Sequence, residues 1–191
     1  MCYFLENAEI CAVKPQKILF IGGPGTGKSS LIEYLKEKGF CCLSEISREV
    51  TLEAQKEGID QLFLTEPIVF SSLLLKGRIK QFEEAENLPE EKVFIDRGIP
   101  DVTAYLDFGK HPSPKTFLKA NRDFRYDKIF FFPFWEEIYL TDNERYESPG
   151  EAKKIEKHLI QTYESLGYEL IHVPKISVEE RAKFILKHCD G

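Results

Sequence analysis

The sequence lacks the features of several protein classes. Its longest apolar stretches, residues 68–75 and 129–135, are broken by two serines and by a proline, so we expect no membrane span. Residues 1–16 have neither a basic start nor a long apolar core and do not resemble a secretory signal. The five cysteines form no C-x-x-C pair, and neither they nor the four histidines have a spacing that suits zinc. An odd number of cysteines, with Cys41 beside Cys42, favours reduced thiols in a cytoplasmic protein.

A basic surface is also missing. The net charge is −6, which argues against a nucleic-acid scaffold because phosphate backbones bind basic faces. The 191 residues, 42% of them hydrophobic, suit one compact α/β domain with a sizeable core. We therefore expect a single domain over residues 1–191.

A phosphate-binding motif is the most informative feature that is present. Residues 22–29, GGPGTGKS, fit the pattern G-x-x-x-x-G-K-[ST] at every fixed position. An expected strand at 17–21 precedes the motif, and an expected helix at 31–36 follows it. This context disfavours the alternative, a glycine-rich turn with a stray lysine. In such a loop backbone N–H groups surround the phosphates, Lys28 reaches the β- and γ-phosphates, and Ser29 binds Mg²⁺. We expect ATP or GTP with Mg²⁺, bound by Gly22, Gly23, Pro24, Gly25, Thr26, Gly27, Lys28, Ser29 and Ser30.

Short apolar strands alternate with helices along the rest of the chain. This alternation predicts an α/β fold with a parallel sheet, right-handed crossovers and helices on both faces. Ligands of such sheets bind at the carboxyl ends of the strands, where the candidate residues below are expected. The further expected strands are 40–43, 92–96, 128–132 and 168–173. The further expected helices are 44–57, 65–86 with Thr65 as its cap, 100–108, a short one from about 115, 151–166, and 177–187 with Ser177 and Glu180 as a capping box.

Asp96 and Arg97 follow the expected strand at 92–96. A carboxylate at this position beside the phosphate loop is suited to bind Mg²⁺ or its water ligands, so we assign Asp96 and Ser29 as metal ligands. Arg97 carries a planar guanidinium that fits a phosphate oxygen. The alternative is that Asp96 caps the next helix and Arg97 lies in solvent.

Glu45 follows the strand at 40–43, and Arg48 lies three residues further on, on the same face of a helix start. A carboxylate opposite the γ-phosphate is placed to take the proton of an attacking hydroxyl group. Arg48 is then a candidate for substrate contact. The alternative is that Glu45 only complements the dipole of the helix N-terminus.

Residues 141–150 form a polar, charged excursion after the strand at 128–132. Arg145 within it is expected to belong to a small lid that closes over the nucleotide and neutralises charge during phosphoryl transfer. A solvated surface loop is the alternative.

For two further groups of residues, a role in packing is a simpler interpretation than a role in binding. Asp101 and Tyr105 share one face of the helix at 100–108, and a substrate contact would be well placed there. The aromatic residues at 130–132, 134 and 135 are expected in the core rather than as a stacking platform.

Taken together, residues 22–29, Glu45, Asp96 with Arg97, and Arg145 resemble the nucleoside and nucleotide kinase branch of the P-loop proteins. The chain is also similar, from about residue 17 to 186, to small predicted ATPases classed as AAA-domain proteins. The segments that carry this second resemblance are 44–49, 94–98, 142–147 and 166–170. The acid after the second strand is also similar to ribosylnicotinamide kinase domains.

The resemblance implies a three-layer P-loop NTPase fold with strand order 2-3-1-4-5 and a lid. It implies that Glu45 is the catalytic acid or base, that Arg97 and Arg145 contact phosphate, and that the loop at Pro174 and Lys175 lines the base pocket. Lys28 and Asp96 complete the expected catalytic group. The chain has no second motor signature, so a ring-forming remodelling ATPase is not expected.

Two functions remain in consideration. The first is a small-molecule kinase that transfers the γ-phosphoryl group of ATP to a hydroxyl or phosphate acceptor. It explains why two strand ends carry an acid and an arginine. The second is a regulatory NTPase or switch that binds a partner. Its best candidate for sensing the γ-phosphate, Thr51, lies inside an expected helix, so the kinase is favoured. The acceptor and the oligomeric state are not specified by the sequence.

Overall fold

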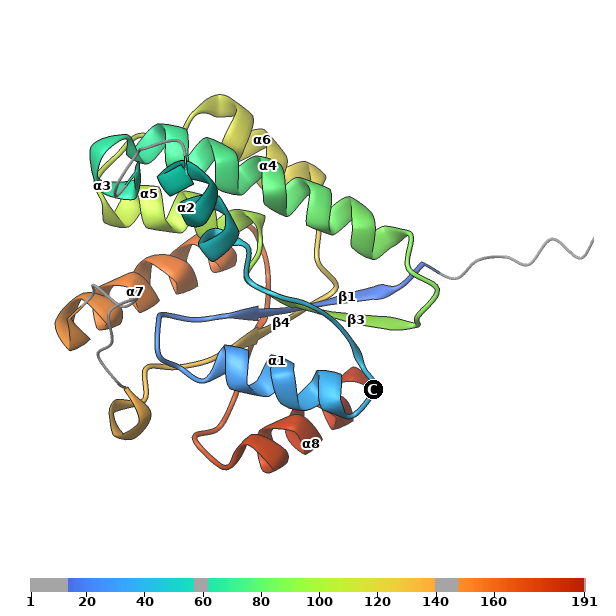
Figure 1. Ribbon diagram of the computed structural model, residues 1–191. Helices are drawn as coiled ribbons and strands as arrows, with labels where there is room; N and C mark the ends of the chain where they lie inside the picture. The colour runs from blue at the N-terminus through green and yellow to red at the C-terminus, as the bar shows by residue number, and fades with distance from the viewer. Residues whose placement is uncertain (1–13, 57–61, 140–147, 191) are drawn as a thin grey trace, which may run out of the picture.

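The computed structural model describes residues 14–56, 62–139 and 148–190 of the chain. Within these ranges, short strands alternate with helices, and no helix has the length and apolarity that a membrane crossing requires (Figure 1). The strands are β1 (Gln16–Ile21), β2 (Cys41–Leu43), β3 (Lys92–Asp96), β4 (Lys128–Phe131) and β5 (Leu170–His172). The helices are α1 (Lys28–Glu37), α2 (Ser47–Lys56), α3 (Leu62–Thr65), α4 (Pro67–Glu86), α5 (Ile99–Phe108), α6 (Lys115–Asp123), the 3₁₀ helix η1 (Glu136–Ile138), α7 (Pro149–Ser165) and α8 (Val178–Cys189).

The five strands form one parallel sheet in the order β2-β3-β1-β4-β5. The central strand β1 pairs with β3 on one side and with β4 on the other, and Phe20 aligns with both Asp96 and Phe130. The loop that follows β1 therefore begins beside the last residue of β3. The parallel sheet and its order confirm the fold predicted from the sequence.

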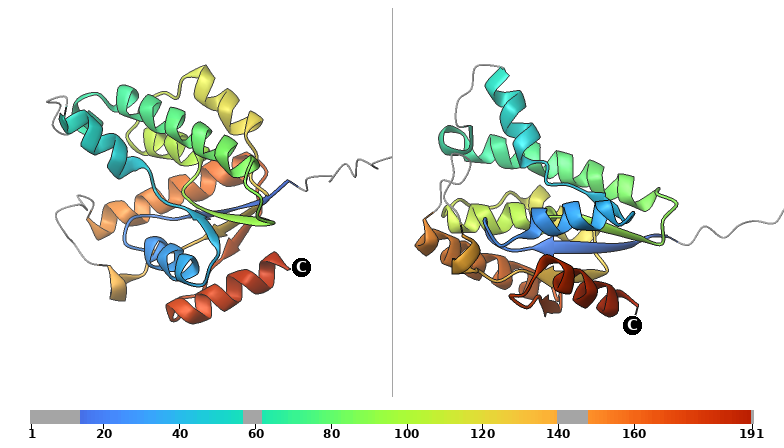
Figure 2. Two further views of the ribbon diagram at one scale, coloured as in Figure 1. Left: turned by 45° about the vertical axis from the view of Figure 1, so that its right-hand side comes forward. Right: turned by 60° about the horizontal axis from the view of Figure 1, so that its bottom comes forward.

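Helices cover both faces of the sheet (Figures 1 and 2). Successive residues of a strand point to opposite faces, so Ile18 and Phe20 of β1 belong to one apolar cluster and Leu19 and Ile21 to the other. The first cluster packs against α1 and α8, and the second against α4, α5, α6 and α7. All four side chains are completely buried. The resulting three layers are those expected for this class of fold.

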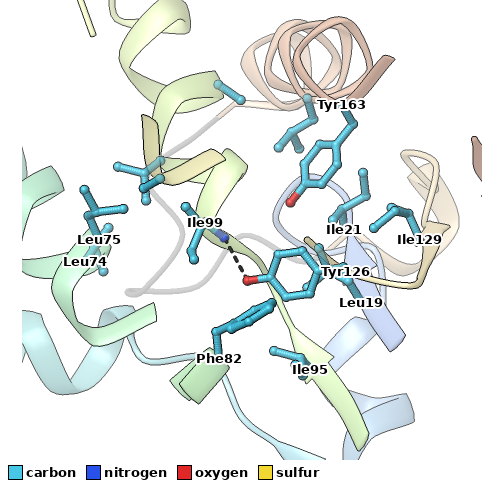
Figure 3. Close-up of a cluster of buried hydrophobic side chains, with 14 of the residues drawn as sticks. Leu19, Ile21, Leu74, Leu75, Phe82, Ile95, Ile99, Tyr126, Ile129 and Tyr163 are labelled. Atoms are coloured by element: carbon cyan, nitrogen blue, oxygen red, sulfur yellow. Dashed lines mark hydrogen bonds between the residues drawn. The ribbon is translucent and has the colours of Figure 1, made fainter. Parts of the chain in front are cut away.

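The core under α4 and α5 fixes where α5 begins. The rings of Phe82 and Tyr126 meet edge to face, with their centroids 5.3 Å apart. The Tyr126 hydroxyl accepts a hydrogen bond of 3.1 Å from the backbone N–H of Ile99, the first residue of α5 (Figure 3). A buried N–H at a helix start needs such an acceptor. This bond anchors the turn between β3 and α5, which carries Arg97.

Some elements differ from the sequence-based expectation. Helix α2 begins at Ser47 rather than at residue 44, because the Glu45 side chain accepts hydrogen bonds from the N–H groups of Ile46 and Ser47 and keeps this segment outside the helix. The helix expected over residues 65–86 is α4, which starts at Pro67 with Glu66 rather than Thr65 at its N-cap, and Thr65 instead ends the separate helix α3. Proline disfavours a helical conformation of the residue before it, which explains the break.

The capping signals near the C-terminus were more accurate. The predicted capping box of Ser177 and Glu180 is confirmed at the start of α8. Helix α7 starts at Pro149, two residues earlier than expected, because Ser148 and Glu151 form a second capping box there.

Candidate functional site

Residues 22–27 connect β1 to α1 at the carboxyl end of the sheet (Figure 1). Two glycines make this loop possible. Gly22 has φ +148°, and a Cβ atom there would lie 2.4 Å from the carbonyl oxygen of Phe132. Gly27, which precedes α1, has φ +81°, a left-handed conformation that side chains disfavour. The loop can therefore lie close to the neighbouring strand and expose N–H groups at a helix N-terminus.

Lys28 folds over this loop. Its Nζ donates hydrogen bonds to the carbonyl oxygens of Gly22 at 2.9 Å and Gly23 at 2.8 Å, and to the Thr26 hydroxyl at 3.2 Å. The side chain is buried, and burial together with the positive charge of Arg97 lowers the pKa of Lys28 to about 7. A nearby anion would favour the charged form of this amine, so a phosphate bound in the loop would form an ion pair with Lys28.

Asp96 is the last residue of β3 and lies beside the start of α1. The Ser29 hydroxyl donates to its Oδ2 at 3.4 Å, whereas its buried Oδ1 has no hydrogen-bond partner among the described residues. Burial raises the pKa of Asp96, although the nearby Lys28 opposes that effect. An unsatisfied buried carboxylate oxygen is unfavourable unless something completes its coordination.

These two residues fit a bound Mg²⁺ ion. Mg²⁺ prefers oxygen ligands and usually binds through one or two protein groups, with water and phosphate oxygens completing its shell. The described residues contain no group of three or more His, Cys, Asp or Glu side chains that could hold a metal. Ser29, which is exposed, and Asp96, with its unpartnered oxygen, supply the kind of small donor set that a nucleotide-bound Mg²⁺ requires.

Glu45 lies just after β2, between two arginines. Its Oε1 accepts a hydrogen bond of 3.1 Å from Nη2 of Arg78, in addition to the two backbone N–H groups at the start of α2. Its Oε2 forms an ion pair with Nε of Arg97. Burial by itself would raise the pKa of Glu45, but Arg78 and Arg97 outweigh it and lower the pKa. Glu45 is therefore a carboxylate at neutral pH, held in one orientation.

Arg97 is held in a strained backbone conformation. Its φ is +69°, a left-handed value that costs a residue with a side chain roughly 1–2 kcal/mol. Its Nη1 donates to the Tyr105 hydroxyl at 3.0 Å and lies 3.7 Å from Oδ1 of Asp101. Strain of this kind persists where the surroundings over-determine it and is concentrated at functional sites. The guanidinium is thereby directed at Glu45.

The substrate role expected for Asp101 does not fit its position. The side chain is completely buried, accepts a 3.0 Å hydrogen bond from the Gly98 N–H, and accepts a 2.5 Å bond from the Tyr163 hydroxyl. Asp101 therefore caps α5 and pairs with the Arg97 guanidinium, and its side chain is not accessible to a ligand. Tyr105 is half-buried and contacts the Arg97 guanidinium, so a substrate role for it stays a prediction.

Two other expected residues fall where the structure gives no side-chain account. Arg145, with most of the expected lid at 141–150, lies outside the described residues. Arg48 lies in α2, but its side chain is also outside what the structure describes. Their roles stay predictions.

Arg78 was not singled out from the sequence. It is buried on α4 and donates a 2.6 Å hydrogen bond to the Gly98 carbonyl oxygen as well as its bond to Glu45. The available signal was its spacing. Arg78 lies on the face of the helix that also carries Leu74, Leu75 and Phe82, and a charged residue on an apolar face requires a buried partner.

The sequence matches a family model described as the AAA domain over residues 17–181. The curated proteins give no match. Among solved structures, the chain is similar to a deoxyadenosine kinase from M. mycoides with dCMP and dCDP bound, with a TM-score of 0.66 and 16% identity over 92% of this chain and 99% of that one. It is also similar to a thymidylate kinase from Candida albicans, with a TM-score of 0.66 and 16% identity over 93% and 92%. NadR protein in complex with NR gives a TM-score of 0.71 and 17% identity over 93% of this chain and 50% of NadR. At these identities the likeness establishes the fold.

Proposed function

This chain belongs to the AAA-domain family, and we propose that it is a phosphotransferase that uses ATP and Mg²⁺. It transfers the γ-phosphoryl group to a hydroxyl or phosphate oxygen of a small acceptor of the nucleoside or nucleotide type. The likeness in fold to nucleoside and nucleotide kinases supports this proposal but does not identify the acceptor.

The observation that carries the proposal is the cluster formed by Glu45 after β2, Arg97 after β3 and Tyr105 of α5. Binding a nucleotide requires the loop at 22–29 and a metal-binding carboxylate. It does not require a second carboxylate that the buried Arg78 and the partly buried Arg97 hold in place. Such a group has a use when an acceptor must be oriented and its proton removed.

The residues divide this work. Lys28 and the loop N–H groups bind the β- and γ-phosphates, and Ser29 with Asp96 would hold Mg²⁺, which supplies positive charge against the phosphate oxygens. Glu45 accepts a hydrogen bond from the acceptor hydroxyl. The acceptor oxygen bonds to the γ-phosphorus while the bond to the β–γ bridging oxygen breaks, and the acceptor proton passes to Glu45. Because the pKa of Glu45 is lowered, it is a weak base and takes this proton late, once the acceptor oxygen has begun to bond.

A ligand screen followed by one substitution tests this function. Nucleosides, nucleotides and sugars are screened by thermal shift with a non-hydrolysable ATP analogue and Mg²⁺, because a ligand that binds only the folded protein raises its melting temperature. The best acceptor is then assayed for ATP-dependent phosphorylation. We expect Glu45→Gln to retain both ligands and to slow transfer by roughly 10²–10⁴-fold.

Two controls make this result interpretable. Glu33→Gln changes an exposed glutamate of α1 and should leave transfer unchanged. Glu45→Asp is the alternative test if the Gln variant does not fold. It keeps the negative charge but places it further from the acceptor, so transfer should also be slow. ATP hydrolysis without any acceptor, unaffected by either change at Glu45, would instead indicate a nucleotide-dependent switch.

A further inference from the structure

Arg181 on α8 is a buried cation next to the phosphate loop. Helices α1 and α8 lie side by side on one face of the sheet (Figures 1 and 2). Arg181 lies beside Thr26 and Gly27, just before the start of α1. Only 4% of its surface is exposed. Its Nη1 lies 3.4 Å from the carbonyl oxygen of Thr26 and 3.5 Å from that of Gly27. Any side chain at Gly27 would collide with it, since a Cβ atom there would be 2.7 Å from Nη1.

The charge of Arg181 has no acidic partner among the described residues. Within residues 14–56, 62–139 and 148–190, no carboxylate forms an ion pair with it and its buried Nε makes no hydrogen bond. The other two arginines of the site, Arg78 and Arg97, differ in this respect. Burial lowers the pKa of each arginine, but acidic neighbours, among them Glu45, reverse that effect at Arg78 and Arg97. At Arg181 burial alone acts and the pKa stays lowered. A buried charge without a carboxylate partner is costly, so other groups must stabilise the charge of Arg181.

The geometry of the peptide groups supplies the connection. The carbonyl of Thr26 and the N–H of Gly27 belong to one planar peptide unit and point in opposite directions. The same holds for the carbonyl of Gly27 and the N–H of Lys28. A positive charge at the two carbonyl oxygens therefore orients both N–H groups toward the opposite side, where the loop receives phosphate. The contacts are longer than strong hydrogen bonds, so they act mainly between a charge and two dipoles.

We propose that Arg181 is a positioning residue of the phosphate loop, which holds the Gly27 and Lys28 N–H groups toward the phosphates. The negative charge of the bound phosphates in turn balances the charge of Arg181. This proposal rests on the nucleotide-binding function proposed above. It adds a residue of α8, distant in sequence from the loop, to the determinants of nucleotide affinity. Arg181 does not touch the ligand in this role and acts through the backbone of the loop.

Trp135 provides a built-in reporter. It is the only tryptophan of the chain, it is partly exposed, and the Arg181 guanidinium lies 5.5 Å from its ring centroid. Phosphate binding that draws the guanidinium toward the loop changes the surroundings of this ring. We therefore expect Mg²⁺ and ATP to change the fluorescence of Trp135 in the native protein but not in an Arg181→Met variant.

The test compares Arg181→Met, which removes the charge and keeps an apolar stem, with Arg181→Lys, which keeps the charge. Lys183→Met is the matched control on the same helix, since Lys183 is exposed and pairs with Glu179. Affinities for ATP and for tripolyphosphate, each with Mg²⁺, are measured by calorimetry. We expect Arg181→Met to weaken both by about tenfold, the low end for a hydrogen bond to a charged group, and Lys to recover most of the loss.

Stability without ligand separates positioning from simple packing. Because the unliganded protein buries this charge without a carboxylate partner among the described residues, Arg181→Met should unfold in urea at a midpoint no lower than that of the native protein. If the midpoint and the affinity both fall, the Lys variant decides: recovery of affinity supports the proposal, and no recovery overturns it.

The remaining outcomes are also decisive. Unchanged affinity in Arg181→Met overturns the positioning role and leaves the proposed function standing. Loss of ATP affinity without loss of tripolyphosphate affinity would show that Arg181 acts on the nucleoside, and it would also overturn the positioning role. If the native protein binds neither ligand, the proposed function itself fails, and the inference with it.

Discussion

The pKa of Lys28 leads to a quantitative prediction about nucleotide binding. Burial and Arg97 lower this pKa to about 7, so at pH 8 about nine tenths of the Lys28 side chains are neutral in the unliganded protein. A triphosphate beside the amine favours its charged form and raises the pKa again. Binding of ATP with Mg²⁺ at pH 8 should therefore take up about 0.9 protons.

Calorimetry in two buffers of different ionisation enthalpy measures this uptake. Phosphate groups themselves titrate near pH 6, so the measurement is made at pH 8, well above that range. The affinity should follow the same equilibrium. Since the proton that Lys28 must gain becomes scarcer as pH rises, the dissociation constant should increase about tenfold per pH unit between about pH 7.5 and 9.

A matched lysine on the same helix provides the control. Lys36 pairs with Glu33 at the surface, and Lys36→Met should leave both the proton uptake and the pH slope unchanged. The reasoning would be refuted by ATP binding at pH 8 without proton uptake and with an affinity that does not change up to pH 9. In that case Lys28 is already fully charged in the free protein.

Three further predictions concern the same site. Glu45→Gln removes the charge between the buried Arg78 and the partly buried Arg97. It should lower the free energy of unfolding by about 3 kcal/mol, a fall of roughly 6–12 °C in melting temperature by circular dichroism. The exposed Glu33→Gln should cost less than about 1 kcal/mol, and equal costs would contradict the stabilising role of the Glu45 ion pairs. Asp96→Asn should weaken ATP binding in Mg²⁺ more than in EDTA, and an equal loss in both would make Asp96 a structural residue only. Gly27→Ala should reduce ATP affinity measured by calorimetry, because its φ of +81° and the nearby Arg181 both oppose a side chain, and retained affinity would show that the loop adapts.

The phosphate loop, the parallel sheet and the position of Asp96 at a strand end were predictable because they depend on local rules. A glycine pattern between an apolar strand and a helix specifies a phosphate loop whatever surrounds it. Alternating strands and helices specify a parallel sheet, and the carboxyl ends of its strands share one edge. The family resemblance supplied the strand order, which the structure confirms.

The partners of Glu45 and Asp101 depended on the tertiary structure. Asp101 has the spacing of an accessible helix residue, yet the Tyr163 hydroxyl from α7 closes over it, 62 positions away in the sequence. Arg78 reaches Glu45 from a helix 33 positions away. No local pattern records which side chains meet across such distances, because packing of separate helices on one face of the sheet decides it.

The sequence by itself thus determined that this protein has a phosphate loop and on which edge of the sheet it works. Only the tertiary structure decided how the charges around that loop are balanced: Glu45 between two arginines, and Arg181 beside the loop with no carboxylate among the described residues. The physical reason is that a motif specifies backbone conformation over a few residues, whereas the balance of buried charge is a sum over groups that only folding brings together.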